Sequence, residues 1–276
     1  MDDARDLFAA AVNRADGTLD LAHASLLIAR LEYPDLDVPS YLARLDEMGR
    51  ALDQRLAEND DDPQTRLAAL CVYLFEEEGF RGNSDEYYDP RNSFLNDVLD
   101  RRVGIPITLS TVFMEVGARV GLEVAGVGLP GHFIVKVQAP EGDVLVDPFY
   151  GGTVLTEDDC QKRLDRISGG KMRLRPQHLA PCPRKQMLAR MLANLKAIYV
   201  KASDNERALG VLELLLSVSA EAEHVRDRGL LYATLDCYKL AAADLICYLD
   251  RAPTARDADS VRATLEEMRH KAARVN

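Results

Sequence analysis

Several features that define well-known classes of protein are missing from this chain of 276 residues. Its five cysteines, at positions 71, 160, 182, 237 and 247, include no CxxC pair. An odd number of cysteines at irregular spacings argues against a disulfide framework and against a metal site built on cysteine. The catalytic signatures HExxH and Gly-x-Ser-x-Gly do not occur either. The segment Gly126-Val-Gly128 lacks the third glycine of a phosphate-binding loop. We therefore expect reduced thiols, no metal and no cofactor.

Long apolar runs are absent as well. The longest falls far short of the ~20 residues that a bilayer requires. The first six residues are acidic, unlike the basic and then apolar start of a secretory leader. These absences predict a soluble, cytoplasmic protein that does not bind membranes.

Basic charge is scarce over most of the chain. The net charge is -11, which disfavours nucleic-acid binding because affinity for phosphates depends on basic side chains. The first 100 residues carry 23 acidic and 9 basic side chains, whereas residues 162–190 carry nine basic and one acidic. This basic segment is either a solvated connector that packs near the acidic N-terminal part or a docking strip for an anionic partner. The sequence does not separate the two.

The hydrophobic pattern changes period along the chain. Residues 1–60 show helical periodicity that is broken at Pro34 and Pro39. Residues 58–63 are expected to form an acidic turn, which lacks the ligand spacing of a calcium loop. Further helices are predicted at 67–75, 93–101 and 106–120. Strands rich in β-branched residues are predicted at 122–129, 132–138 and 144–147. Helices followed by antiparallel strands favour an α+β fold.

The chain is helical again from Arg184. Tyrosines at 199 and 232 and alanines at 208 and 242 recur with a period near 34, and Ala252-Pro253 closes the second unit. This pattern resembles tetratricopeptide repeats. It predicts helix pairs at 185–217 and 221–251 and a capping helix from Asp257, although an ordinary helical bundle fits the same pattern. Two such repeats need support from the rest of the chain.

One histidine and one aspartate fall at opposite ends of neighbouring strands. His132 opens one predicted strand and Asp147 closes the next, so a hairpin that turns near Glu141 pairs the two positions directly. A histidine that acts as a general base needs such a partner on its other ring nitrogen. The alternative is that His132 is a half-buried strand residue and Asp147 a turn residue before Pro148.

Four segments together resemble one known family. They are Asn92-Ser-Phe-Leu-Asn96, Arg102-Val-Gly-Ile-Pro-Ile-Thr-Leu-Ser110, Gly126-Val-Gly-Leu-Pro-Gly-His132 and Val146-Asp-Pro-Phe149. With the repeat-like tail, they are similar to the SirB family of bacterial proteins, within the transglutaminase-like superfamily of papain-related folds. The resemblance implies a transglutaminase-like domain with a helical N-terminal cap over residues 1–180 and a tetratricopeptide-like domain over 181–276.

The resemblance also implies a Cys-His-Asp triad, of which one member is missing. Counting back along the helix from Gly121 puts the nucleophile position on Pro106, which has no nucleophilic atom. His132 and Asp147 then form a degenerate dyad, and Asn96, Thr108 and Gly131 line the cleft. Ser110, on the face of Pro106 but one turn deeper, is a candidate substitute nucleophile, although its hydroxyl does not occupy the place of the thiol. Thr108 faces away, and Cys71, Cys160 and Cys182 are further alternatives.

Three functions remain open from the sequence. The preferred one is a catalytically degenerate factor that binds a protein or peptide through the cleft and the helical tail. The second is a residual hydrolase or acyltransferase in which the dyad activates water or Ser110. The third is a structural role in which the dyad only fixes the hairpin. The sequence indicates neither the partner nor the oligomeric state.

Overall fold

The computed structural model describes residues 2–56 and 62–274. Most of the acidic turn at 58–63 lies outside these residues. The helices are α1 Asp2–Val12, α2 Leu21–Ala29, α3 Val38–Asp53, α4 Pro63–Cys71, α5 Leu95–Arg101, α6 Pro106–Arg119, α7 Glu157–Ser168, α8 Arg184–Lys201, α9 Asn205–Val218, α10 Ala222–Thr234, α11 Tyr238–Arg251 and α12 Ala258–Arg274. The strands are β1 Arg81–Gly82, β2 Val103–Gly104, β3 Val124–Val127, β4 Ile134–Val137, β5 Val144–Asp147 and β6 Thr153–Leu155.

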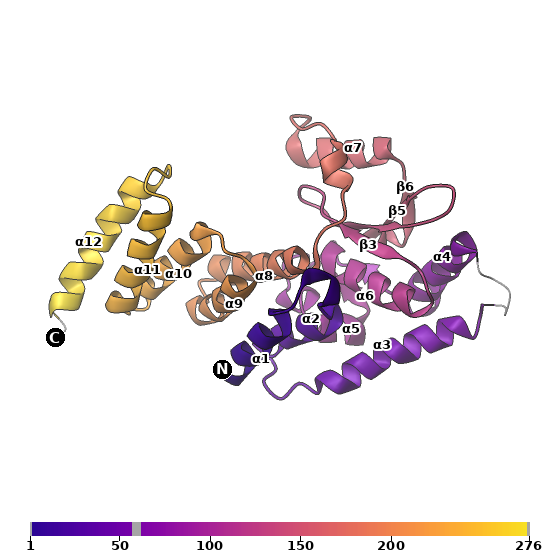
Figure 1. Ribbon diagram of the computed structural model, residues 1–276, viewed down its shortest axis with the longest axis horizontal. Coiled ribbons are helices and arrows are strands. Elements are labelled where there is room, and N and C mark those ends of the chain that lie inside the picture. Colours follow the sequence, from indigo (N-terminus) through magenta and orange to yellow (C-terminus); the bar gives the residue numbers. More distant parts are fainter. Residues whose placement is uncertain (1, 57–61, 275–276) are drawn as a thin grey trace.

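The main sheet is antiparallel, in the order β3-β4-β5-β6, and helices cover both of its faces (Figure 1). Alternate residues of β4 point to opposite sides, so Val135 and Val137 join the main core on the side of α6, whereas Ile134 packs with Leu179 and Cys160 on the side of α7. A pair of two-residue parallel strands, β1 and β2, lies near α6. These elements confirm the α+β class.

The β4–β5 hairpin forms, but its register differs from the expected one. Val135 pairs with Val146, so Asp147 lies opposite Ile134 and not opposite His132. The turn is centred near Pro140 and Glu141, where Gly142 N–H donates to the carbonyl of Ala139, one residue later than the sequence suggested. His132 therefore lies in the turn before β4. A shift of two residues leaves the same side chains on each face.

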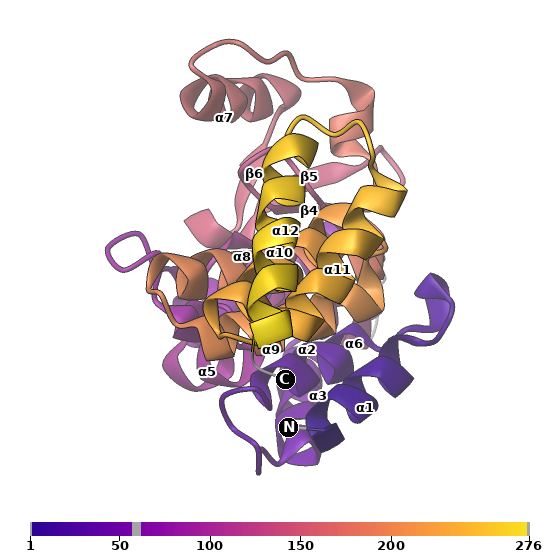
Figure 2. The ribbon, with the colours of Figure 1, turned by 90° about the vertical axis from the view of Figure 1, so that its left-hand side faces the viewer.

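The helical tail contains the predicted elements. Helices α8 and α9 form one antiparallel pair, α10 and α11 a second, and α12 packs on α11 (Figures 1 and 2). The main hydrophobic core continues past residue 180 into the first pair, where Leu192 and Leu212 belong to the same cluster as Phe8 and Leu26. Tyr248, in contrast, packs in a separate cluster formed by the last helices. The first repeat therefore shares its core with the N-terminal cap.

The N-terminal part of the chain also caps the tail. Asp16 lies in a short 3-10 turn, Asp16–Thr18, and its two carboxylate oxygens accept the N–H groups of Arg184 and Lys185 at 3.0 and 2.9 Å. These N–H groups have no carbonyl partner within α8, and a negative charge at a helix N-terminus is favourable. None of the helices in residues 2–56 and 62–274 combines the length and apolarity needed to cross a bilayer.

Candidate functional site

The side chains of His132 and Asp147 meet at the end of the sheet. His132 Nε2 lies 2.7 Å from Asp147 Oδ2, although the two residues are not paired in the ladder. The imidazole is 10% exposed and the carboxylate is fully buried. Nε2 therefore donates to the carboxylate in the neutral ring, which leaves Nδ1 as the nitrogen available to a ligand.

Backbone contacts hold the His132 turn in place. Gly131 has a φ of 69°, a left-handed conformation that glycine adopts at little cost. Arg190 of α8 donates through Nη2 to the carbonyls of Leu129 and His132, at 3.0 and 2.9 Å. Its guanidinium also lies over the ring of Phe133, 5.2 Å from the centroid. The first helix of the tail thus positions the imidazole.

Both carboxylate oxygens of Asp147 have hydrogen-bond or ion-pair partners. Besides His132, its carboxylate accepts the N–H of Phe149 at 3.0 Å, and Arg163 Nη1 lies 2.9 Å from Oδ2. Arg163 comes from α7 and stacks on Tyr150, 4.5 Å from the ring centroid. The guanidinium supplies the opposite charge that a buried carboxylate needs. Sequence reasoning missed Arg163; its only signal was membership of the basic segment 162–190.

The N-terminus of α6 faces the same region. Pro106 is the first residue of the helix, where the missing N–H of proline costs nothing. The hydroxyl of Thr108 accepts the N–H of Ile105 at 3.2 Å and donates to the carbonyl of Asn92, 2.8 Å away. Thr108 thus caps the helix and is fully buried.

A cavity of about 100 Å³ separates Pro106 from the His132 turn. It is lined by Tyr87, Ile105, Pro106, Ile107, Gly131, His132, Phe133, Arg190 and Asn194. Three segments far apart in the sequence therefore meet here: the start of α6, the turn before β4 and the middle of α8. Of the three residues expected to line the cleft, Gly131 is part of this lining. Asn96 and Thr108 are not, because one is buried on α5 and the other is used as the helix cap.

Ser110 is fully buried on α6. Its Oγ has no hydrogen-bond partner among the described residues, so it makes none with His132. The cause is its position one turn deeper than Pro106, inside the packing between α6 and its neighbours. It is absent from the cavity lining.

The thiols considered as substitutes lie in environments that favour the protonated form. Burial raises the pKa of Cys71 to about 11, and burial also raises the pKa values of Cys160 and Cys182. Cys71 lies against the Gly152 carbonyl, with Sγ 3.9 Å from its oxygen, and none of the three lines the cavity at His132. Because the thiolate is the reactive form, these sites lack activation.

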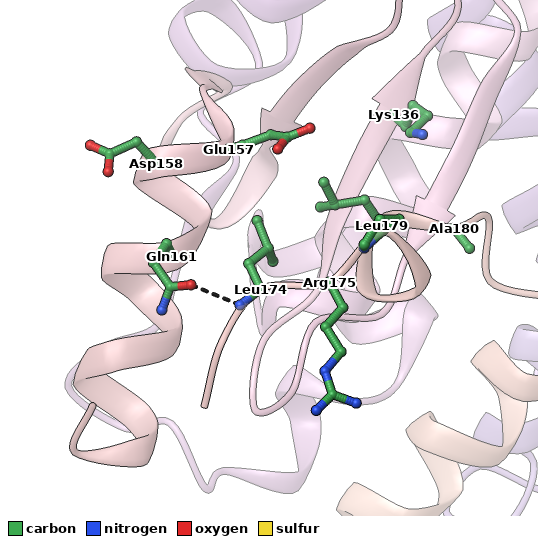
Figure 3. Close-up of a pocket in the computed structure, with 9 residues that line it drawn as sticks. Lys136, Glu157, Asp158, Gln161, Leu174, Arg175, Leu179 and Ala180 are labelled. Carbon is green, nitrogen blue, oxygen red and sulfur yellow. Dashed lines mark hydrogen bonds between the residues drawn. The ribbon is translucent and has the colours of Figure 1, made fainter. Parts of the chain in front are cut away.

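A larger cavity, of about 520 Å³, lies away from the dyad, between α7 and the segment 174–180 (Figure 3). Gln161 spans part of it by accepting the N–H of Leu174 at 2.7 Å. Its charged side chains are mixed in sign, Glu157 and Asp158 against Lys136 and Arg175. Lys136 is already paired with Asp143 at 3.1 Å. Within the described ranges, no cluster of three or more histidine, cysteine or acidic side chains could hold a metal ion.

Comparisons with known proteins agree with this architecture. A family model described as the transglutaminase-like superfamily matches residues 39–193, and one described as a tetratricopeptide repeat matches residues 195–266. A UPF0162 protein of Xylella fastidiosa (strain 9a5c) is 38% identical over 257 residues, which cover 92% of this chain and 91% of that protein. Two more distant relatives are the UPF0162 protein YchA of Escherichia coli (strain K12) and Protein SirB1 of Salmonella typhimurium (strain LT2). Each is 27% identical over 244 residues, 88% of this chain and 89% of the relative.

The first match spans more than half of the chain, and the Xylella relative is similar over nearly its whole length. The chain therefore belongs to the transglutaminase-like superfamily and, within it, to the UPF0162 family that includes Protein SirB1.

Proposed function

We propose that this protein is a catalytically degenerate member of its superfamily that binds a protein or peptide segment at the cavity between α6, the His132 turn and α8. The observation that carries the proposal is Pro106. It occupies the helix start beside the cavity, across from His132, at the position that the family resemblance gives to the nucleophile. A site that keeps its base and its orienting carboxylate but has a proline ring at this point can bind a segment without attacking it.

The rim of the cavity supports a polypeptide ligand. Tyr87 lines the cavity, and its ring packs edge-to-face on Tyr88 at 5.4 Å. Tyr150 lies 6.1 Å from the His132 ring. These three tyrosines are 37%, 65% and 53% exposed, and exposed tyrosine rings are enriched in protein interfaces. Lys201, at the end of α8, lies over Tyr88, so a ligand on this rim would contact both the core and the tail.

The residual-hydrolase alternative lacks a suitably placed side-chain nucleophile in the part of the chain that the structure describes. Ser110 is buried without a hydrogen bond to His132, and the hydroxyl of Thr108 is used as a helix cap. A serine or threonine nucleophile needs an adjacent base within hydrogen-bonding reach. The placement of these two hydroxyls therefore favours binding over catalysis by a side-chain nucleophile.

Restoring the nucleophile tests the proposal. We expect Pro106→Cys to create a thiol that iodoacetamide modifies faster near neutral pH than the exposed Cys237, because the helix N-terminus and His132 both lower a thiol's pKa. Adding His132→Ala should remove this advantage. Peptide mapping by mass spectrometry identifies the modified cysteine, and Cys237 is the internal reference.

The unmodified protein provides the complementary measurement. Incubation with a fluorophosphonate and with iodoacetamide should give no label that depends on His132. Label on Ser110, Thr108 or Cys71 that disappears in His132→Ala would show that the protein retains a nucleophile, and the proposal would then be wrong.

A further inference from the structure

Arg190 is a half-buried cation that has no counter-ion among the described residues. Two backbone carbonyls accept from its Nη2, but in residues 2–56 and 62–274 no carboxylate lies within ion-pair distance of the guanidinium. Burial lowers its pKa, which reflects the cost of keeping a charge away from water. Arginine side chains in this environment are normally paired. Several other half-buried arginines of this chain are paired with carboxylates, and Arg228, for example, binds Asp244 at 2.7 and 2.8 Å.

The rest of the cavity also favours negative charge. The 14-residue helix α6 begins at its edge, and the first N–H groups of a helix lack carbonyl partners and carry a partial positive charge. His132, nine-tenths buried, contributes Nδ1, which has no hydrogen-bond partner among the described residues and is a donor when the ring is doubly protonated. None of the nine lining residues is acidic, although the chain carries a net charge of -11. The nearby Asp147 lies behind the imidazole ring and is neutralised by Arg163.

We propose that this cavity binds a carboxylate group carried by a peptide, with the guanidinium of Arg190 as its counter-charge and His132 Nδ1 as a hydrogen-bond donor. The inference rests on the proposed peptide-binding function and adds the chemistry of the group that is bound. In the doubly protonated ring both nitrogens donate, so the imidazolium lies between two carboxylates, that of the ligand at Nδ1 and that of Asp147 at Nε2. The carboxylate can be a chain terminus or an acidic side chain, and a volume of about 100 Å³ suits this small group.

Acetate is the simplest probe, and acetamide is its neutral control. With full-length protein labelled with ¹⁵N in histidine, we expect acetate to shift the His132 Nδ1 resonance saturably toward the protonated position. Acetamide should leave it unchanged at the same concentration, since it carries no charge for Arg190. The spectrum of His132→Gln assigns the signal.

A single added charge tests the location. Asn194 lines the cavity, and Asn194→Asp adds a negative charge without changing the size of the side chain. It should weaken acetate binding by about tenfold or more, because like charges repel and the new carboxylate can pair with Arg190. The matched control is Asn205→Asp at the start of α9, which should bind acetate normally. Arg190→Gln is a second variant, with circular dichroism as the check that it folds. Equal binding by Asn194→Asp, or equal shifts with acetamide, would overturn the carboxylate assignment.

Short peptides distinguish the source of the carboxylate and separate the two proposals. A peptide that binds only with a free C-terminus assigns the chain terminus, and one that loses affinity on Glu→Gln substitution assigns the side chain. Peptides that bind equally when amidated and free of acidic residues would leave the peptide-binding function standing and refute the carboxylate inference. Acetate binding without affinity for any of these peptides would support a carboxylate site and refute the peptide-binding function.

Discussion

At the residue scale, the carboxylate of Asp147 is tightly constrained. It is fully buried and has three partners, His132, Arg163 and the N–H of Phe149. Removing one member of a buried ion pair leaves the other charge uncompensated, at a cost of about 3–5 kcal/mol. We therefore expect Asp147→Ala to lower the free energy of unfolding by about that amount, measured by urea denaturation.

Neighbouring residues on α7 give the control for this prediction. Arg163→Met should also destabilise the fold, because it removes the counter-charge of Asp147. Lys162 is 61% exposed and, among the described residues, pairs only with Asp158 and Asp159 on the same helix, so Lys162→Met should leave the stability nearly unchanged. Equal effects of the two substitutions would contradict a structural role for the Arg163–Asp147 pair.

At the scale of elements, the capping of α8 by Asp16 links two distant segments of the chain. Loss of a helix N-cap typically costs about 1 kcal/mol. We expect Asp16→Ala to destabilise the protein by about 1–2 kcal/mol, because two N–H groups lose their acceptor. Asp16→Asn should cost less, since its amide oxygen still accepts. Denaturant unfolding measures both, and the exposed Asp35 provides a substitution to alanine that should be close to neutral.

The sequence could predict those parts of the site that depend on local pattern. Strand alternation and the turn near Glu141 brought His132 and Asp147 together despite the shift in register. Arg163 and Arg190 could not be assigned in the same way. They reach the site from α7 and α8, and where a helix lies depends on the packing of its apolar face rather than on the spacing of its charges. Thr108 was misjudged for a related reason, because a hydroxyl near a helix start satisfies the backbone first.

At the scale of the whole molecule, the repeats are not equivalent. The first pair, α8 and α9, completes the main core, whereas the last helices pack in a cluster of their own. We predict that residues 1–219 fold cooperatively and keep the His132–Asp147 contact. Residues 1–183 should not fold stably, because the cap loses the partners of Phe8 and Leu26 and the His132 turn loses Arg190.

Circular dichroism, urea unfolding and limited proteolysis of the two fragments test this prediction. The histidine resonances report whether the dyad persists in the longer one. A stable, cooperatively unfolding 1–183 fragment would show that the first repeat is dispensable for the core.

The bond between Asp16 and the start of α8 has a consequence for how the protein is made. Part of the apolar surface of α1 and α2 cannot be buried until α8 and α9 have been synthesised, because α1 packs on α9 and α2 packs on α8. Contacts between residues so far apart in sequence slow folding. On the ribosome, this part of the surface of α1 and α2 therefore stays accessible to chaperones until nearly four fifths of the polypeptide has been made.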